Sequence, residues 1–236
     1  MKIGISEQVL KMFPEFTRGV LVARDINNHG EDENLSKEME ELLKTTRRDK
    51  TLRDYKSHPK IASWRDAFQR FSVNPNACPP SIANLVKRTV GGAKLPFISK
   101  VVTIFNIMSL KHILPLGGDD LESVVGDLRL EVAKGDEIYI PLGKPNIVEH
   151  PTPGEIVYFD SGDKKVLCRA WCWRNSEITK ILPETSSVAI NVDGLPPIGQ
   201  EQVIEIMGEL AEKIEKHCGG STTPYVLSNQ NPWFEI

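Results

Sequence analysis

The segment from Gly154 to Leu195 constrains the fold most, because it contains three predicted strands in close succession. Residues 155–159 are mostly β-branched or aromatic, and the following residues 160–163 (Asp-Ser-Gly-Asp) are typical of a hairpin turn. The next residues alternate with a period of two, which predicts a strand through 168–173. A third strand is predicted over 188–193, after a polar loop of the kind that often carries binding residues.

The second of these strands has two contrasting faces. The predicted alternation puts Cys168, Ala170 and Cys172 on one face, and Arg169, Trp171 and Trp173 on the other. Small residues on one face of a strand indicate close packing against another layer, so we expect both thiols to be buried and unreactive. The chain has four cysteines and no CxxC pair, which favours free thiols in a reducing cytoplasm over disulfides.

Helices are predicted mainly in the first half of the chain and strands mainly in the second. Apolar residues at helical spacing predict helices near residues 35–48, 61–71 and 81–90, an apolar buried helix over 97–113, and a last amphipathic helix over 200–218. Strands are expected at 17–26 and mostly between 126 and 193. This segregation indicates an α+β fold. A chain of 236 residues is long enough for one large domain or two small ones.

Composition and motifs exclude several classes of function. The net charge of −3 gives no overall attraction to nucleic acid, so an RNA site would have to be a local patch. No apolar run approaches the roughly 20 residues that span a bilayer, and the N-terminus lacks the apolar core of an export signal, so we expect a cytoplasmic protein without membrane contact. Neither a phosphate-binding glycine motif nor a zinc-ligand spacing is present, and no cofactor is expected.

Two features of the middle of the chain allow two interpretations each. Asn106 lies inside the apolar helix, where its amide either ties down a neighbouring loop or is presented into a pocket. The Gly117-Gly118 pair is either a plain turn or a loop whose backbone N–H groups approach a ligand closely. Spacing alone favours the first interpretation of Asn106 and leaves the glycine pair open.

Several motifs resemble the B3/B4 domain of the phenylalanyl-tRNA synthetase beta subunit, and especially its free-standing relatives. They are the runs GEIVYFD and CRAWCWRNSE, the PET triplet at 183–185, and the FN…PLG spacing from residue 105. The resemblance covers about residues 15–215 and implies a single domain over 1–236. The implied fold is α+β, with a β-sandwich-like core of the B3/B4 type flanked by helices. In the synthetase this domain hydrolyses tyrosine that is wrongly attached to the phenylalanine tRNA.

The resemblance assigns roles position by position. Asn106 and Pro115 match the family's upstream motif, whereas Gly117 stands where the family has a histidine. A glutamate that recognises the tyrosine hydroxyl falls near Asn191, with Asp193 on the same strand face. The chain therefore departs from the family at two positions tied to tyrosine editing. We expect Asn106, Pro115, Asn191 and Asp193 to line an amino-acid pocket, with the backbone N–H groups of Gly117 and Gly118 at its rim as catalytic oxyanion donors.

The function implied by the resemblance is a tRNA-associated protein that hydrolyses mischarged aminoacyl-tRNA in trans. The partners would then be a tRNA acceptor end and an amino acid or aminoacyl group. The candidates for contacts to the terminal nucleotides are Arg169, Trp171, Trp173, Arg174 and Lys180. The two tryptophans are equally consistent with a second hydrophobic cluster. The alternatives for the whole chain are a non-catalytic RNA- or aminoacyl-binding module and an unrelated small-molecule role of the same pocket.

Overall fold

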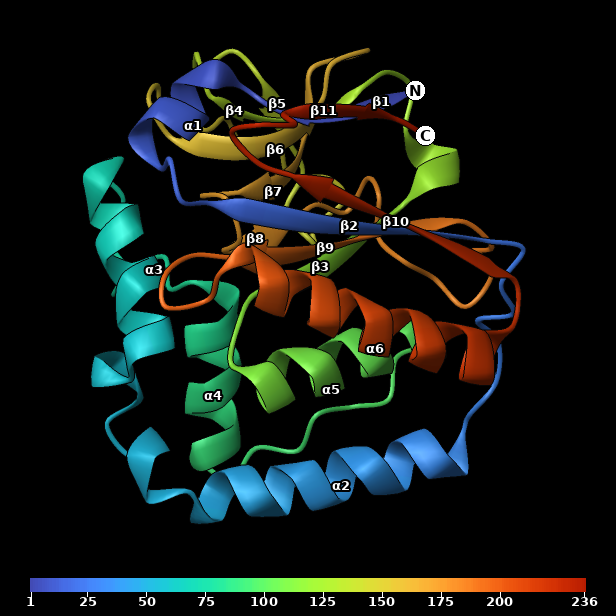
Figure 1. Cartoon of the computed structure of the whole chain (residues 1–236). Coiled ribbons are helices and arrows are strands. Elements are labelled where there is room, and N and C mark those ends of the chain that lie inside the picture. Colours follow the sequence, from blue (N-terminus) through green and yellow to red (C-terminus); the bar gives the residue numbers. More distant parts are fainter.

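Two β-sheets form the centre of the molecule, and most of the helices lie on the outer side of the smaller sheet (Figure 1). The computed structural model describes all residues, 1–236. The smaller sheet has the order β10-β2-β9-β3 and is antiparallel throughout. Its strands are β2 (Thr17–Arg24), β3 (Leu116–Asp120), β9 (Val188–Gly194) and β10 (Ser221–Leu227).

The larger sheet has the order β11-β1-β4-β6-β7-β5, and β8 pairs with β7 outside this path. Its strands are β1 (Lys2–Ile5), β4 (Leu128–Val132), β5 (Ile138–Tyr139), β6 (Ile156–Asp160), β7 (Lys165–Arg169), β8 (Arg174–Asn175) and β11 (Trp233–Glu235). The predicted hairpin is present, because β6 and β7 pair antiparallel across the turn at 161–164. The first and last strands are neighbours, so the two termini lie together (Figure 1).

Helices α5 and α6 pack on the smaller sheet, and α2 lies against α5 on the side away from that sheet (Figure 1). Helix α1 lies against β4 of the larger sheet, and α3 and α4 stand beside the stack. The helices are α1 (Glu7–Met12), α2 (Glu33–Arg48), α3 (Pro59–Arg70), α4 (Ser81–Val90), α5 (Lys100–His112) and α6 (Gln200–Cys218). Short 3-10 helices occupy 50–52, 55–57 and 121–123.

The α+β fold with a β-sandwich-like core flanked by helices is confirmed. One apolar core cluster extends from Ile3 to Leu227 and joins side chains of both sheets and of all six helices. Burial of this apolar surface is the main force that holds the layers together. None of the helices combines the length and the apolar character that crossing a membrane requires.

The predicted alternation through 168–173 is wrong beyond Arg169. Strand β7 ends there, and a tight turn follows in which Ala170 and Trp171 both adopt positive φ, at 44° and 65°. This backbone costs a non-glycine residue free energy. The turn swings Trp171 into an aromatic cluster, where its ring lies 4.7 Å from that of Phe16 and 5.1 Å from that of Trp64. Burial of the large ring offsets the backbone strain.

Candidate binding pocket between the two sheets

The face of the smaller sheet that meets the larger sheet carries a row of polar residues. Arg18 of β2 pairs with Asp193 of β9, and Gly117 of β3 pairs with Asn191 of β9. Because side chains alternate along a strand, Arg18, Asn191 and Asp193 share this face. They lie opposite Tyr158 of β6 in the larger sheet, whose ring is 4.7 Å from the Arg18 guanidinium carbon.

Arg18 and Asp193 form a buried, bidentate ion pair. Arg18 Nε and Nη2 donate to the two Asp193 carboxylate oxygens at 2.7 and 2.8 Å, and the residues are only 1% and 3% exposed. Burial opposes the charge of Arg18, but the neighbouring carboxylate outweighs it and leaves the pKa of the guanidinium raised. Both side chains are therefore ionised, and the net charge of the pair is close to zero. Asp193 lines the pocket as predicted, but both of its oxygens are already engaged by Arg18.

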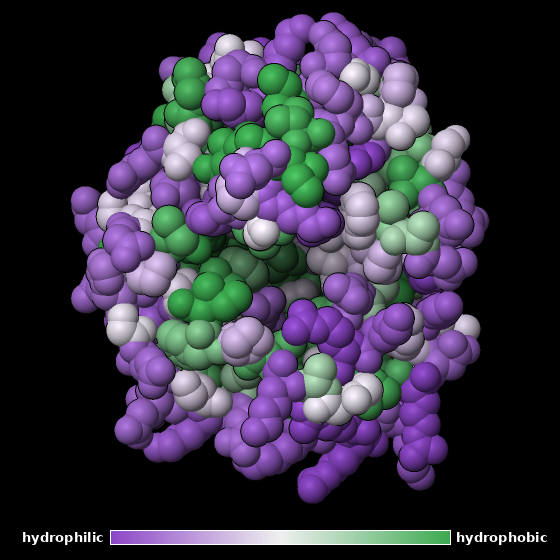
Figure 2. Space-filling view, turned by 180° about the vertical axis from the view of Figure 1, so that it is seen from behind, coloured by the Kyte–Doolittle hydropathy of each residue, from purple (hydrophilic) through white to green (hydrophobic).

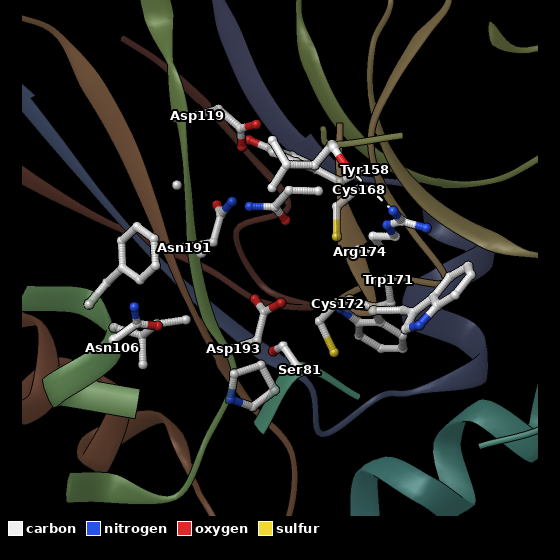
Figure 3. A pocket seen from close by; sticks show the side chains of 18 of the residues that line it. Ser81, Asn106, Asp119, Tyr158, Cys168, Trp171, Cys172, Arg174, Asn191 and Asp193 are labelled. Carbon is white, nitrogen blue, oxygen red and sulfur yellow. Dashed lines mark hydrogen bonds between the residues drawn. The ribbon is translucent and has the colours of Figure 1, made fainter. Parts of the chain in front are cut away.

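A cavity of about 320 Å³ opens beside this row, between α5, the β3 edge of the smaller sheet and the turn after β7 (Figure 3). Its volume is within the range of small-molecule sites. Figure 2, which views the side opposite to Figure 1, shows that this face of the molecule is hollowed near its centre. Every residue predicted for the pocket or its rim lines this cavity: Asn106, Pro115, Gly117, Gly118, Asn191 and Asp193.

Helix α5 presents one side to the cavity. Its residues are mostly buried, as the apolar sequence predicts, but Val102, Phe105 and Asn106 are only half-buried and line the cavity wall. The Asn106 amide donates and accepts no hydrogen bond within the chain, so it does not tie down a neighbouring loop. Of the two interpretations of Asn106, presentation into a pocket therefore fits the geometry.

The Gly117-Gly118 pair forms part of a strand, so the prediction of a rim loop is wrong. The Asp193 N–H donates to the Pro115 carbonyl at 3.2 Å, and antiparallel pairing alternates from there. The N–H of Gly117 therefore points at β9, whereas that of Gly118 points away from it. Of the two N–H groups, that of Gly118 is therefore the one that β9 does not occupy, and it is the candidate oxyanion donor.

Gly117 also leaves room in the cavity. A Cβ atom added there would come no closer than 3.8 Å to the Asn175 side chain, which is an ordinary contact. The position that resembles the family's histidine site therefore faces open space that a side chain could fill.

Five buried polar atoms of the lining have no hydrogen-bond partner: Ser81 Oγ, Trp171 Nε1, Arg18 Nη1, Tyr158 Oη and Asn191 Oδ1. The last three belong to strands of the two sheets, and their residues are 1%, 1% and 8% exposed. Burial raises the pKa of the Tyr158 hydroxyl well above its usual range, so it remains a neutral donor and acceptor. No sequence pattern marks Arg18 or Tyr158 as a site residue, because each lies in an ordinary β-branched or aromatic strand and its partners are far away along the chain.

Asp119 is a further lining residue that the sequence did not single out. Its carboxyl group accepts a hydrogen bond from Thr179 Oγ1 at 2.5 Å and is buried. Burial raises its pKa to about 6, although the Thr179 hydroxyl and the Arg18 charge act in the opposite direction. Its place could have been predicted, because Asp119 follows Gly117 by two residues and so lies on the same face of a strand. The two adjacent glycines, however, favoured a turn or loop over a strand at this point.

The PET triplet has a structural role next to the cavity. Thr185 Oγ1 donates to Asp120 at 2.8 Å and accepts from the Leu182 N–H at 3.0 Å. These bonds fasten the loop after β8 to the end of β3, and so hold the loop residue Thr179 beside Asp119.

Two buried thiols also face the cavity, those of Cys168 and Cys172 (Figure 3). Both residues and Ala170 are buried, as predicted. Burial raises the pKa of both thiols, which keeps them protonated. Their lack of reactivity stays a prediction.

Most of the residues predicted to contact RNA are engaged elsewhere. Arg169 donates to Glu155 at 3.0 and 2.8 Å and to Glu149 at 3.2 Å, and Lys180 pairs with Glu177. Trp171 is 1% exposed, so the structure corrects its predicted stacking on a nucleotide in favour of the hydrophobic-cluster alternative. The charges of Arg169 and Lys180 are thus balanced by carboxylates of the same chain, and the ring of Trp171 is packed in the core.

Trp173 and Arg174 remain available at the cavity wall. Both are half-buried, and the Arg174 guanidinium has a single hydrogen bond, to the Leu142 carbonyl at 3.4 Å, and no carboxylate partner. The structure thus offers one uncompensated guanidinium and one indole ring beside the cavity, rather than a basic patch.

The fold and the cavity define a class: an α+β protein in which a two-sheet core encloses a polar pocket. A family model described as the B3/4 domain matches residues 63–229, and the chain belongs to this family. No curated protein matches the chain.

Solved structures with a similar fold include an N-terminal fragment of the phenylalanyl-tRNA synthetase beta subunit from Pyrococcus horikoshii. The TM-score is 0.46 and the sequence identity 12%, over 96% of this chain and 54% of that fragment. The chain therefore spans about half the length of the fragment. Because the likeness is this distant, we assign no residue roles in this chain from that fragment.

Proposed function

We propose that the cavity binds the aminoacyl group at the acceptor end of a tRNA and that the protein hydrolyses mischarged aminoacyl-tRNA in trans. The observation that carries this proposal is the convergence of Asn106, Pro115 and Asn191 on one cavity, although they lie on three separate segments. A cavity of about 320 Å³ accommodates an amino acid.

The chemistry requires a base for water and a donor for the developing oxyanion. Asp119 is buried in the lining and, with a pKa of about 6, is largely ionised near neutral pH while still a useful base. In the proposed step, Asp119 takes a proton from water as the water oxygen bonds to the ester carbon. The carbon–oxygen bond to the ribose then breaks, and the proton returns to the ribose oxygen. The N–H of Gly118 is the candidate donor to the oxyanion.

The test is a deacylation assay on a panel of tRNAs, each charged with a non-cognate amino acid. We expect accelerated ester loss for at least one of them, and a loss of that acceleration in Asp119→Asn. The matched control is Asp66→Asn, an exposed carboxylate on α3, which should act as wild type. Absence of turnover across the panel would remove the hydrolase.

A non-catalytic aminoacyl-binding module is the second candidate. Two observations favour it: Gly117 stands where the family has a histidine, and Arg169 and Lys180 are paired with carboxylates. Saturable binding of an aminoacyl group without turnover would distinguish this module from the hydrolase.

A further inference from the structure

Three of the polar atoms without partners, those of Arg18, Tyr158 and Asn191, constrain what can bind in the cavity. Leaving a buried donor or acceptor unsatisfied costs about 1–3 kcal/mol, and such groups are rare in native structures. Here Arg18 Nη1 is a donor, Asn191 Oδ1 is an acceptor and Tyr158 Oη is both. The Asn191 side chain lies close enough to the Tyr158 hydroxyl to lower its pKa slightly against the effect of burial, but no hydrogen bond of good geometry joins the two. All three belong to residues that line one cavity, so a bound group that complements them replaces the water they would otherwise need.

Charge narrows the choice of that group. The Arg18 charge is already balanced by Asp193, both of whose oxygens accept from it. A ligand carboxylate has acceptors only, so it would leave Asn191 Oδ1 without a donor. A ligand ammonium has donors only, so it would leave Arg18 Nη1 without an acceptor. Neither charged group therefore complements all three atoms.

An apolar group is disfavoured for a different reason. It would displace water from all three atoms without forming hydrogen bonds to them. A site built for hydrogen bonds rejects an analogue that lacks them far more strongly than an apolar pocket rejects a missing methylene.

We infer that the inner end of the cavity recognises an uncharged carboxamide. This inference rests on the proposed function, and it makes the aminoacyl group one of the asparagine or glutamine class. The amide carbonyl accepts from Arg18 Nη1, the amide NH₂ donates to Asn191 Oδ1, and Tyr158 Oη complements either end. Val102 and Phe105 of α5 provide apolar wall for the methylene groups.

The test is titration calorimetry with non-hydrolysable probes, the N-methylamides of L-glutamine, L-asparagine, L-glutamate and L-methionine. We expect the better of the two carboxamide probes to bind at least about tenfold more tightly than the glutamate and methionine probes, which corresponds to about 1.4 kcal/mol. Asn191→Leu removes the acceptor at similar volume. It should weaken the carboxamide probe at least about tenfold and leave the methionine probe unchanged or improved.

Tyr158→Phe is the second variant, because it keeps the ring under Arg18 and removes only the hydroxyl. It should weaken the carboxamide probe by a smaller factor than Asn191→Leu does. A melting temperature near wild type shows that each variant is folded.

The outcomes separate this inference from the proposed function. Tighter binding of the methionine or glutamate probe would overturn the carboxamide inference and leave the aminoacyl pocket standing. A carboxamide preference without deacylation of any tRNA would support the inference and remove only the hydrolase. Failure of every probe to bind would overturn the inference and the aminoacyl pocket together.

Discussion

The two faces of the four-stranded sheet serve different purposes. The face covered by α5 and α6 is apolar and tightly packed: a Cβ added to Gly19 would overlap Met207 and lie 2.9 Å from Val203 Cγ1. The face toward the larger sheet carries the Arg18–Asp193 pair and borders a cavity, and a Cβ added to Gly117 would have room. One face thus contributes stability through close packing. The other retains polar groups whose burial costs free energy, which is expected of a binding site.

The largest effect should come from breaking the ion pair on the polar face. Asp193→Leu leaves the Arg18 guanidinium buried without its partner, and we expect a loss of about 3–5 kcal/mol in the free energy of unfolding. The double variant Arg18→Leu/Asp193→Leu should recover most of this loss, because it removes both charges. Urea unfolding of the wild type, the single variant and the double variant measures these free energies.

The control for this prediction is Lys37→Gln, which breaks the exposed pair with Glu33 on α2. Exposed pairs contribute little, so its effect should stay within about 1 kcal/mol. A single Asp193→Leu variant as stable as this control would show that the buried pair is not held as described.

The acid on the same face should produce a pH-dependent effect of similar size. Burial raises the pKa of Asp119 to about 6 from 3.8, so the folded protein keeps a proton that the unfolded chain loses between those values. This carboxyl therefore favours the fold at low pH, and the contribution is lost as the pH rises through about 6.

Asp119→Asn should abolish that dependence. Relative to wild type, its free energy of unfolding should rise by about 2.4 kcal/mol between about pH 4 and pH 7, with a slope that approaches about 1.4 kcal/mol per pH unit between the two pKa values. The measurement is urea unfolding of both proteins at the two pH values. If the difference in the free energy of unfolding between the two proteins were the same at both pH values, the pKa of Asp119 would not be raised by burial.

The two glycines provide a smaller and direct comparison of the faces. Gly19→Ala should destabilise the protein by about 1–3 kcal/mol, because the added methyl group overpacks the contact with α6. Gly117→Ala should change stability by less than about 0.5 kcal/mol, and alter ligand binding instead. Thermal unfolding of the two variants checks this, and equal losses would contradict the contrast between the faces.

The smallest effect concerns RNA. Arg174 is the candidate cation without a carboxylate partner, so tRNA binding should depend weakly on salt, with a log–log slope near about −0.7 for one phosphate contact. Arg174→Ala should flatten this slope, whereas Lys180→Ala should not, because Lys180 is paired with Glu177. Filter binding at several salt concentrations tests both variants, and equal slopes for the two would argue against a phosphate at Arg174.

Local patterns in the sequence predicted much of this architecture. The bounds of α4 agree with the prediction, and the hairpin of β6 and β7 appears where its turn residues indicated. These elements depend on neighbouring residues, so periodicity and turn chemistry suffice to find them. The convergence of Asn106 and Asn191 came from the family resemblance, since no local pattern connects two segments so far apart.

What could not be predicted depends on contacts between distant residues. Arg18 and Asp193 are 175 positions apart, so nothing in either strand announces their pairing. The turn that buries Trp171 exists because aromatic residues from other elements surround its ring. The raised pKa of Asp119 results from burial between layers, which a strand containing two glycines did not suggest.

The most direct test of the polar face as an aminoacyl site is a crystal structure with a bound analogue. Crystals would be soaked in turn with 3′-aminoacylamino-adenosines that carry glutamine, methionine or tyrosine, in which an amide replaces the labile ester. We expect at least one of these aminoacyl groups between α5 and β9, with its side chain directed at Asn191 and its adenosine toward Trp173 and Arg174. An analogue that binds only outside this cavity, or a cavity that stays empty with all three at saturating concentration, would contradict the assignment.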